Sequence, residues 1–178
     1  FATEAAIRLA LDTEDFTGFE LPALLHSNGN YARDDAGEIV RDGEGRELFQ
    51  RTPILLDSDY LLGPEAGHAN WTGQSGLATK TSHAVFLIAS AFQRMQAEGK
   101  SVAALMFNVK GSDLLWLDKA ANPESEDEGL RDAYAAAGAR LFRPQDFKDY
   151  EAFGLEPAPF ANFRIFAPFR AGLEPGQG

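Results

Sequence analysis

A periodic apolar pattern between residues 80 and 98 constrains the fold of this chain more than any other feature of its sequence. Its apolar side chains recur at intervals of three and four residues, which predicts one buried face of an α-helix. Gly99 follows as a helix-terminating residue. The uninterrupted apolar run 102–107 comes next and is typical of a buried parallel strand. The apolar positions of the helix are Ala84, Leu87, Ile88, Ala91, Phe92 and Met95.

The segment before this helix completes a larger unit. Residues 68–72 are a short strand candidate, and a glycine-containing loop joins them to the helix. Strand, loop, helix and strand within about 40 residues make a βαβ unit. The sequence therefore predicts an α/β fold with a parallel sheet over residues 63–178.

Residues 1–62 predict a small β-rich unit instead. The stretch 5–11 alternates loosely between apolar and polar residues, as a half-buried strand does. Asn-Gly and Asp-Gly pairs between residues 28 and 45 favour tight turns, because glycine tolerates positive φ. The segments 38–41 and 47–49 are short enough to be hairpin arms.

Beyond the βαβ unit the sequence predicts shorter elements. Residues 114–117 favour a helical turn that packs Leu and Trp inward, and residues 118–129 form an acidic, solvated loop. An alanine-rich helix is expected over residues 129–138. The alternating stretch 162–167 predicts another strand, which Pro168 terminates.

Composition excludes several kinds of function. The chain has no cysteine, which rules out disulfides, thiolate zinc sites and a cysteine nucleophile and fits a reducing cytoplasm. No apolar run approaches the roughly 20 residues that cross a bilayer, so we expect a cytoplasmic protein without a membrane partner. The net charge of −11 argues against nucleic-acid binding over the whole surface, but it allows a local basic channel between subunits. Because the chain starts at Phe1, we expect both ends to be cuts or processing products of a longer protein.

The loop before the long helix has the residue types that bind nucleotide phosphates. Gly73 and Gly76 let backbone amides converge on an anion, and Lys80 at the helix start has the length to reach β- and γ-phosphates. Thr81 offers a hydroxyl to Mg²⁺, and the helix N-terminus adds its dipole and unpaired amides. The pattern predicts a phosphate site for ATP with Mg²⁺.

The strict P-loop spacing is not met. Counting back from Lys80, the two required glycines fall on Gln74 and Thr79, and Gly73 is one residue too early. The loop is therefore one residue longer than usual or wound differently. The alternative is an ordinary glycine-rich turn capped by Thr79 or Ser82.

Three stretches together resemble a bacterial branch of the HerA/FtsK superfamily of ATPases. Residues 62–65 and 68–82 are similar to its variant P-loop, GxSGLATKTS, and residues 107–118 to its NVKGxDLLxLD segment. Residues 150–155, 159–160 and 163–168 resemble its next connection and strand. The similarity covers residues 52–170.

This resemblance implies a RecA-like P-loop NTPase core in residues 63–178, preceded by the end of a small β-barrel in residues 1–62. It implies ATP hydrolysis with Mg²⁺ by a homo-hexamer that pumps double-stranded DNA, in some cases beside a nuclease partner. Lys80 would hold the phosphates, Thr81 the Mg²⁺, and Asp113 would lie near the metal or the attacking water. The remaining residues of the implied nucleotide site are Gly73, Ser75, Gly76, Leu77, Ala78, Thr79 and Ser82.

The sequence gives little support for other catalytic or metal-binding residues. A motor of this class needs a second carboxylate after an apolar strand. Asp118 imitates that position but follows the preceding strand too closely, and Asp57 and Asp59 are in the wrong chain order. The three histidines are too scattered for a zinc site, and His83 is expected to pack or cap. Ser75 lacks the G-x-S-x-G elbow of a serine hydrolase.

Three functions therefore remain. The first is the ATP-binding portion of an ATP-driven DNA translocase or helicase, inactive as this fragment alone. The second is a regulatory module that binds nucleotide without turnover and without dependence on DNA. The third is a non-enzymatic oligomerisation domain with a vestigial P-loop, whose assembly would be indifferent to Lys80→Ala.

Overall fold

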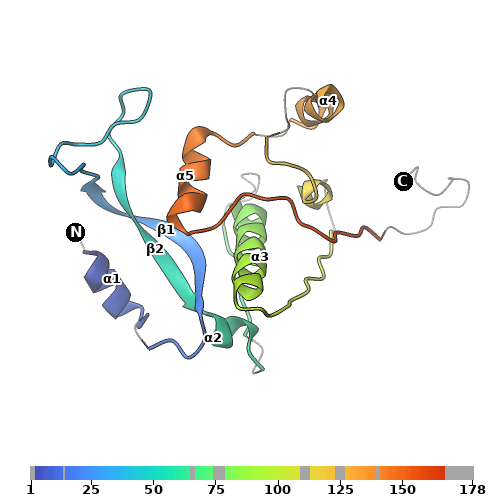
Figure 1. Cartoon of the computed structure of the whole chain (residues 1–178), viewed down its shortest axis with the longest axis horizontal. Coiled ribbons are helices and arrows are strands. Elements are labelled where there is room, and N and C mark those ends of the chain that lie inside the picture. Colours follow the sequence, from blue (N-terminus) through green and yellow to red (C-terminus); the bar gives the residue numbers. More distant parts are fainter. Residues whose placement is uncertain are drawn as a thin grey trace, which may run out of the picture. The chain divides into compact units, whose positions relative to one another are not determined.

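A computed structural model describes residues 3–13, 15–64, 67–73, 79–108, 113–122, 127–138 and 141–166 (Figure 1). The chain forms two compact units, which are described separately. The first contains residues 1–105 and 146–156, and the second contains residues 106–145 and 157–178. The elements are α1 (Glu4–Ala10), β1 (Glu20–Tyr31), β2 (Phe49–Asp57), α2 (Ser58–Leu62), α3 (Thr79–Ala97), the 3₁₀ turn η1 (Asp113–Trp116), α4 (Glu128–Ala136) and α5 (Pro144–Ala152).

The sheet of the described residues is a two-stranded antiparallel ribbon of β1 and β2 (Figure 1). Leu21 pairs with Leu56 at one end of the ribbon, and Tyr31 pairs with Phe49 at the other, where the two rings stack at 5.1 Å. The prediction of a RecA-like core with a parallel sheet is therefore wrong for this structure. A barrel is likewise not observed in the described part of residues 1–62.

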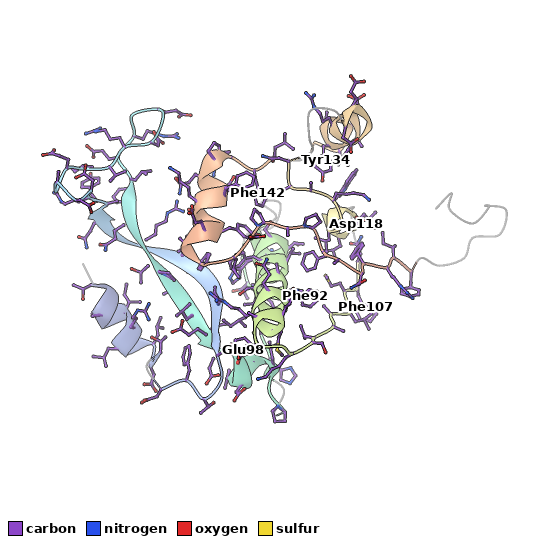
Figure 2. The ribbon with its side chains drawn as sticks, in the orientation of Figure 1. Phe92, Glu98, Phe107, Asp118, Tyr134 and Phe142 are labelled. Carbon is purple, nitrogen blue, oxygen red and sulfur yellow. The ribbon has the colours of Figure 1, made fainter. Side chains whose placement is uncertain are left out.

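The two segments expected to be parallel strands remain unpaired in the described ranges. Residues 68–72 precede α3 in the chain and residues 102–107 follow it, and neither segment forms a strand. Leu105 is 79% exposed and Phe107 is 80% exposed, and Figure 2 shows Phe107 on the stretch that follows α3. A strand needs hydrogen-bonding neighbours for its backbone groups, and apolar character alone does not supply them.

The core of the first unit lies between β1 and α3. Leu21 and Ala23 alternate along the strand and so point to the same face, while Leu87 and Ala91 lie one turn apart on the helix. These four side chains form one buried cluster. The helix predicted for residues 80–98 is confirmed, since α3 occupies Thr79–Ala97.

The expected helix stop at Gly99 is also confirmed. Gly99 has a φ of +65°, which a residue with a Cβ rarely adopts. Its amide donates to the Gln96 carbonyl at 3.0 Å, and the Lys100 amide donates to the Met95 carbonyl at 2.8 Å. This pair of bonds is the Schellman motif, which satisfies carbonyls at a helix end.

The strand predicted for residues 5–11 is wrong, because α1 is a helix there. The Thr3 side chain accepts a hydrogen bond from the Ala6 amide at 3.2 Å and so caps the helix N-terminus. The alanines that follow Thr3 have the highest helix propensity of all residues. The loose alternation of the sequence was outweighed by these local preferences.

Two tight turns connect β1 to β2, where the sequence predicts hairpin arms. Asp34 Oδ1 accepts from two amides within the first turn, and Asp42 Oδ1 does the same in the second. Each turn ends in a glycine with positive φ, Gly37 at +84° and Gly45 at +80°. The arms are reduced to isolated bridges, Arg33 with Ile39 and Arg41 with Glu47.

Three backbone hydrogen bonds join the residues before, between and after these turns in a ring. The Val40 amide donates to the Ala32 carbonyl, the Leu48 amide to the Val40 carbonyl, and the Ala32 amide to the Leu48 carbonyl, at 2.8–2.9 Å. The three residues are spaced eight apart, and an Arg-Asp pair follows both Ala32 and Val40. The same Arg-Asp sequence thus precedes each of the two turns.

The Asp57 carboxylate joins the end of β2 to the segment before β1. It accepts hydrogen bonds from the Thr17 amide and hydroxyl, the Gly18 amide and the Asp59 amide at 2.8–3.1 Å. A Cβ at Gly18 would lie 2.3 Å from Ser58 Oγ, so this position requires glycine. Burial opposes the charged carboxylate, but the four hydrogen bonds outweigh it and lower the pKa of Asp57.

The segment 146–156 packs beside α3 within the first unit. The Phe86 ring contacts the rings of Tyr150 at 5.4 Å and Phe153 at 5.1 Å. The Gln93 side chain forms two hydrogen bonds with the backbone of Glu156, one through its amide nitrogen and one through its oxygen. These contacts cover part of α3.

The second unit is organised around η1 and α4. The predicted helical turn at 114–117 is confirmed by η1, and the predicted helix at 129–138 by α4. Trp116 packs edge-on against Tyr134 at 5.2 Å, and the Tyr134 hydroxyl donates to the Ala120 carbonyl at 2.6 Å. The strand predicted at 162–167 is not formed over its described part, 162–166. Within the described ranges, no helix combines the length and apolarity that crossing a bilayer requires.

Candidate phosphate-binding site

The described part of the candidate site comprises Gly73 and the first residues of α3. Gly73 is the last described residue before the loop, and Lys80 is the second residue of the helix. The Lys80 ammonium Nζ donates a hydrogen bond to the Gly73 carbonyl oxygen at 2.9 Å, seven positions earlier in the chain. The lysine side chain is therefore turned back toward the start of the loop rather than out along the helix.

This arrangement suits the binding of an anion. A carbonyl oxygen carries only a partial charge, and a phosphate oxygen in the same position makes a stronger, charge-assisted bond to an ammonium group. The 19-residue helix α3 presents its positive dipole end at the same place. Its first turn contains no acidic residue, so no carboxylate of that turn competes with a bound phosphate.

The predicted site residues differ in what the structure describes of them. Gly73 and Lys80 are brought together by the hydrogen bond described above. Thr81 is half-buried and Ser82 is exposed, and both lie on α3 directly after Lys80. Thr79 is the first residue of the helix, and its side chain lies outside the described part. The predicted loop residues Ser75, Gly76, Leu77 and Ala78 also lie outside the described residues.

The predicted second catalytic residue belongs to another part of the chain. Asp113 begins η1 and is assigned to the second unit, and its side chain is outside the described part. Its role near a metal stays a prediction. Asp118 pairs with Lys119 at 2.9 Å, and this hydrogen bond raises the pKa of Lys119. Asp57 serves as the structural junction described above.

The start of α3 offers a hydroxyl group, and no acidic residue lies in its first turn. In the described ranges, no three His, Asp or Glu residues gather as they would around a metal ion held by protein alone. A nucleotide brings its own Mg²⁺ ligands on its phosphates, and the protein then needs to add only a hydroxyl. Thr81, next to Lys80, has that chemistry.

Two residues beside the loop were not identified as site residues from the sequence. Trp71 Nε1 donates a hydrogen bond to His83 Nδ1 at 2.6 Å, and His83 Nε2 lies 2.8 Å from the Ala23 carbonyl oxygen. The expectation that His83 packs or caps is thus refined to a specific pair of hydrogen bonds. The sequence feature that could have identified them is their position, because Trp71 precedes the loop and His83 follows it.

No known protein family, curated protein or solved structure matches this chain. The resemblance to the HerA/FtsK superfamily therefore rests on the sequence motifs quoted above. The case for a phosphate site rests on those motifs and on the geometry at the start of α3.

Proposed function

We propose that this chain binds the phosphates of Mg·ATP at residues 73–82 and is the ATP-binding portion of an ATP-driven DNA translocase or helicase. The observation that carries the proposal is the hydrogen bond from Lys80 Nζ to the Gly73 carbonyl at the start of α3. It supports a lysine that is already directed at the loop before a nucleotide arrives. Such preorganisation lowers the cost of ordering the side chain on binding.

Each residue has a distinct task in this proposal. Lys80 exchanges the Gly73 carbonyl for β- and γ-phosphate oxygens, and Thr81 ligates the Mg²⁺. The amides of residues 75–79 and the positive end of the α3 dipole neutralise the remaining phosphate charge. Asp113 approaches the metal or the attacking water when the complete catalytic site is assembled.

The motor activity comes from the resemblance to the HerA/FtsK superfamily. It assigns a cytoplasmic homo-hexamer that moves double-stranded DNA, with a nuclease as a possible partner of the assembly. The net charge of −11 argues against DNA binding across the whole surface, so the proposed DNA path is a local basic channel between subunits. Phosphoryl transfer needs a further carboxylate to hold Mg²⁺ and orient water, so we expect this chain alone to bind ATP weakly and to hydrolyse it hardly at all.

Isothermal titration calorimetry with Mg·ATP tests the binding step. We expect saturable binding by the wild-type chain and by the control Lys148→Ala, which removes an exposed lysine of α5. Lys80→Ala should weaken binding about tenfold or more, because a hydrogen bond to a charged group contributes about 1.5–3 kcal/mol. Equal binding by Lys80→Ala and the wild type would refute the phosphate site.

A second titration tests the link to DNA. Mg·ATP is added to the wild-type chain with and without a double-stranded oligonucleotide, and ADP replaces ATP in a parallel experiment. A translocase portion should distinguish ATP from ADP or respond to DNA. Identical affinities under all these conditions would instead favour the regulatory module that binds nucleotide without turnover.

A further inference from the structure

We infer that Trp71 and His83 are positioning residues, which hold the two ends of the candidate phosphate loop at a fixed separation. The inference rests on the proposed function and adds to it two residues outside the P-loop pattern. Trp71 lies two residues before Gly73, and His83 lies three residues after Lys80. Their side chains are joined by a hydrogen bond, although they lie twelve positions apart in the chain.

The hydrogen-bond chemistry fixes the form of the histidine. An indole N–H only donates, so His83 Nδ1 must accept the 2.6 Å bond from Trp71. The ring hydrogen of neutral His83 then sits on Nε2, where it donates to the Ala23 carbonyl at 2.8 Å. One neutral tautomer thus satisfies both contacts at once.

Both residues contact the core of the first unit. Ala23 is 3% exposed and belongs to the core cluster between β1 and α3, and Trp71 packs against that cluster. The rings of Trp71 and His83 meet edge to face, with centroids 6.1 Å apart at 68°. The two hydrogen bonds of His83 therefore connect Trp71, before the loop, to β1 and to α3.

Two hydrogen bonds therefore join residues before the loop to α3, and they respond differently to a bound phosphate. The Lys80–Gly73 bond occupies the group that would hold a phosphate, so a bound nucleotide must replace it. The Trp71–His83 bond uses no group of the P-loop pattern and persists when a phosphate binds. It keeps Gly73 near the helix start while the lysine changes partners, and this retained order lowers the entropic cost of binding.

The test measures Mg·ATP affinity by calorimetry for variants that remove the bond and keep the aromatic volume. Trp71→Phe should bind about three- to tenfold more weakly, the equivalent of one lost hydrogen bond. His83→Phe should bind at least as weakly as Trp71→Phe, because it also loses the hydrogen bond to the Ala23 carbonyl. The matched controls Trp116→Phe, in the second unit, and His68→Phe, at an exposed position, should bind as the wild type does. All variants are measured well below their melting temperatures, so that unfolding does not contribute.

Two further variants separate positioning from packing. The double variant Trp71→Phe/His83→Phe should bind about as weakly as His83→Phe alone, because His83→Phe already removes the bond to Trp71. His83→Gln, which restores a donor and an acceptor, should recover part of the affinity that His83→Phe loses. If His83 served only as packing volume, Phe would be the better replacement and Gln the worse.

The outcomes distinguish this inference from the proposed function. No binding by the wild-type chain overturns both. Binding by the wild type together with affinities within about twofold for Trp71→Phe and His83→Phe overturns the positioning role alone. Additive losses in the double variant also overturn it, since two independent effects would then be present.

Discussion

Residues 21–25 of strand β1 and the segment 102–107 are both apolar, yet only the residues of β1 are part of a sheet. Leu21 in β1 is fully buried, whereas Leu105 is 79% exposed. β1 pairs with β2 along one edge and is covered by α3, while the described part of the chain supplies no strand beside 102–107. The comparison shows that neighbouring elements decide which apolar segments become strands.

The difference follows from how each pairing is reached along the chain. Two tight turns between Tyr31 and Phe49 bring β1 and β2 together as antiparallel neighbours. A parallel pairing of 102–107 with 68–72 would need a crossover through α3 and further strands to cover both faces. The antiparallel pairing forms with the residues present. The parallel pairing would depend on strands that the described residues do not provide.

The largest expected effect comes from truncating the paired strand. Leu21→Ala leaves a cavity against Ala23, Leu87 and Ala91, and core truncations of this kind cost about 2–5 kcal/mol. Urea denaturation followed by circular dichroism measures the change in unfolding free energy. A loss below about 0.5 kcal/mol, typical of a surface site, would contradict the assignment of this cluster as the core.

A smaller effect on stability is expected at Asp57, whose carboxylate joins the end of β2 to the segment before β1. The pKa of Asp57 is below its ordinary value of 3.8, so the folded state favours the carboxylate. Its stabilising contribution is complete above pH 3.8 and disappears as the pH falls through the lower folded value. Asp57→Asn should therefore lower the urea midpoint at neutral pH and lose less stability than the wild type on acidification.

Asp35→Asn, at an exposed turn position, is the matched control for this pH series. It should keep the neutral-pH midpoint and the acid dependence of the wild type. If Asp57→Asn and Asp35→Asn gave the same curves, the four hydrogen bonds to Asp57 would contribute nothing that depends on its charge.

The smallest effect is expected in the unpaired segment. Leu105→Ala removes the same atoms as Leu21→Ala, but from a side chain that is already 79% exposed. The change in unfolding free energy should stay within about 0.5 kcal/mol. A cost similar to that of Leu21→Ala would show that 102–107 is a buried strand and would remove the contrast between the two regions.

Local signals explain what could be predicted of the fold. The helix α3 and its stop at Gly99 depend on residues within a few turns of each other, and both were found from the sequence. The same kind of reasoning failed at residues 5–11, where weak alternation suggested a strand and the Thr3 cap with its alanines favoured a helix. The apolar run 102–107 could not by itself establish a parallel sheet, because strand pairing depends on a second strand beside it.

The candidate site divides in a similar way. Gly73, Lys80 and Thr81 follow from the order of residue types before a helix, and the contact between Lys80 and Gly73 agrees with that order. The Trp71–His83 pair depends on a third partner, the Ala23 carbonyl of β1, far away in the sequence. No local pattern identifies such a contact.

The most direct test of the central claim is a backbone amide NMR titration of the wild-type chain with Mg·ATP. A phosphate cradle at the start of α3 predicts saturable shifts that are largest for the amides of residues 75–82, with much weaker shifts in Lys80→Ala. The ribbon of β1 and β2 should change little beyond Ala23, which contacts His83. Saturable shifts centred elsewhere, or identical shifts in Lys80→Ala, would contradict phosphate binding by this loop.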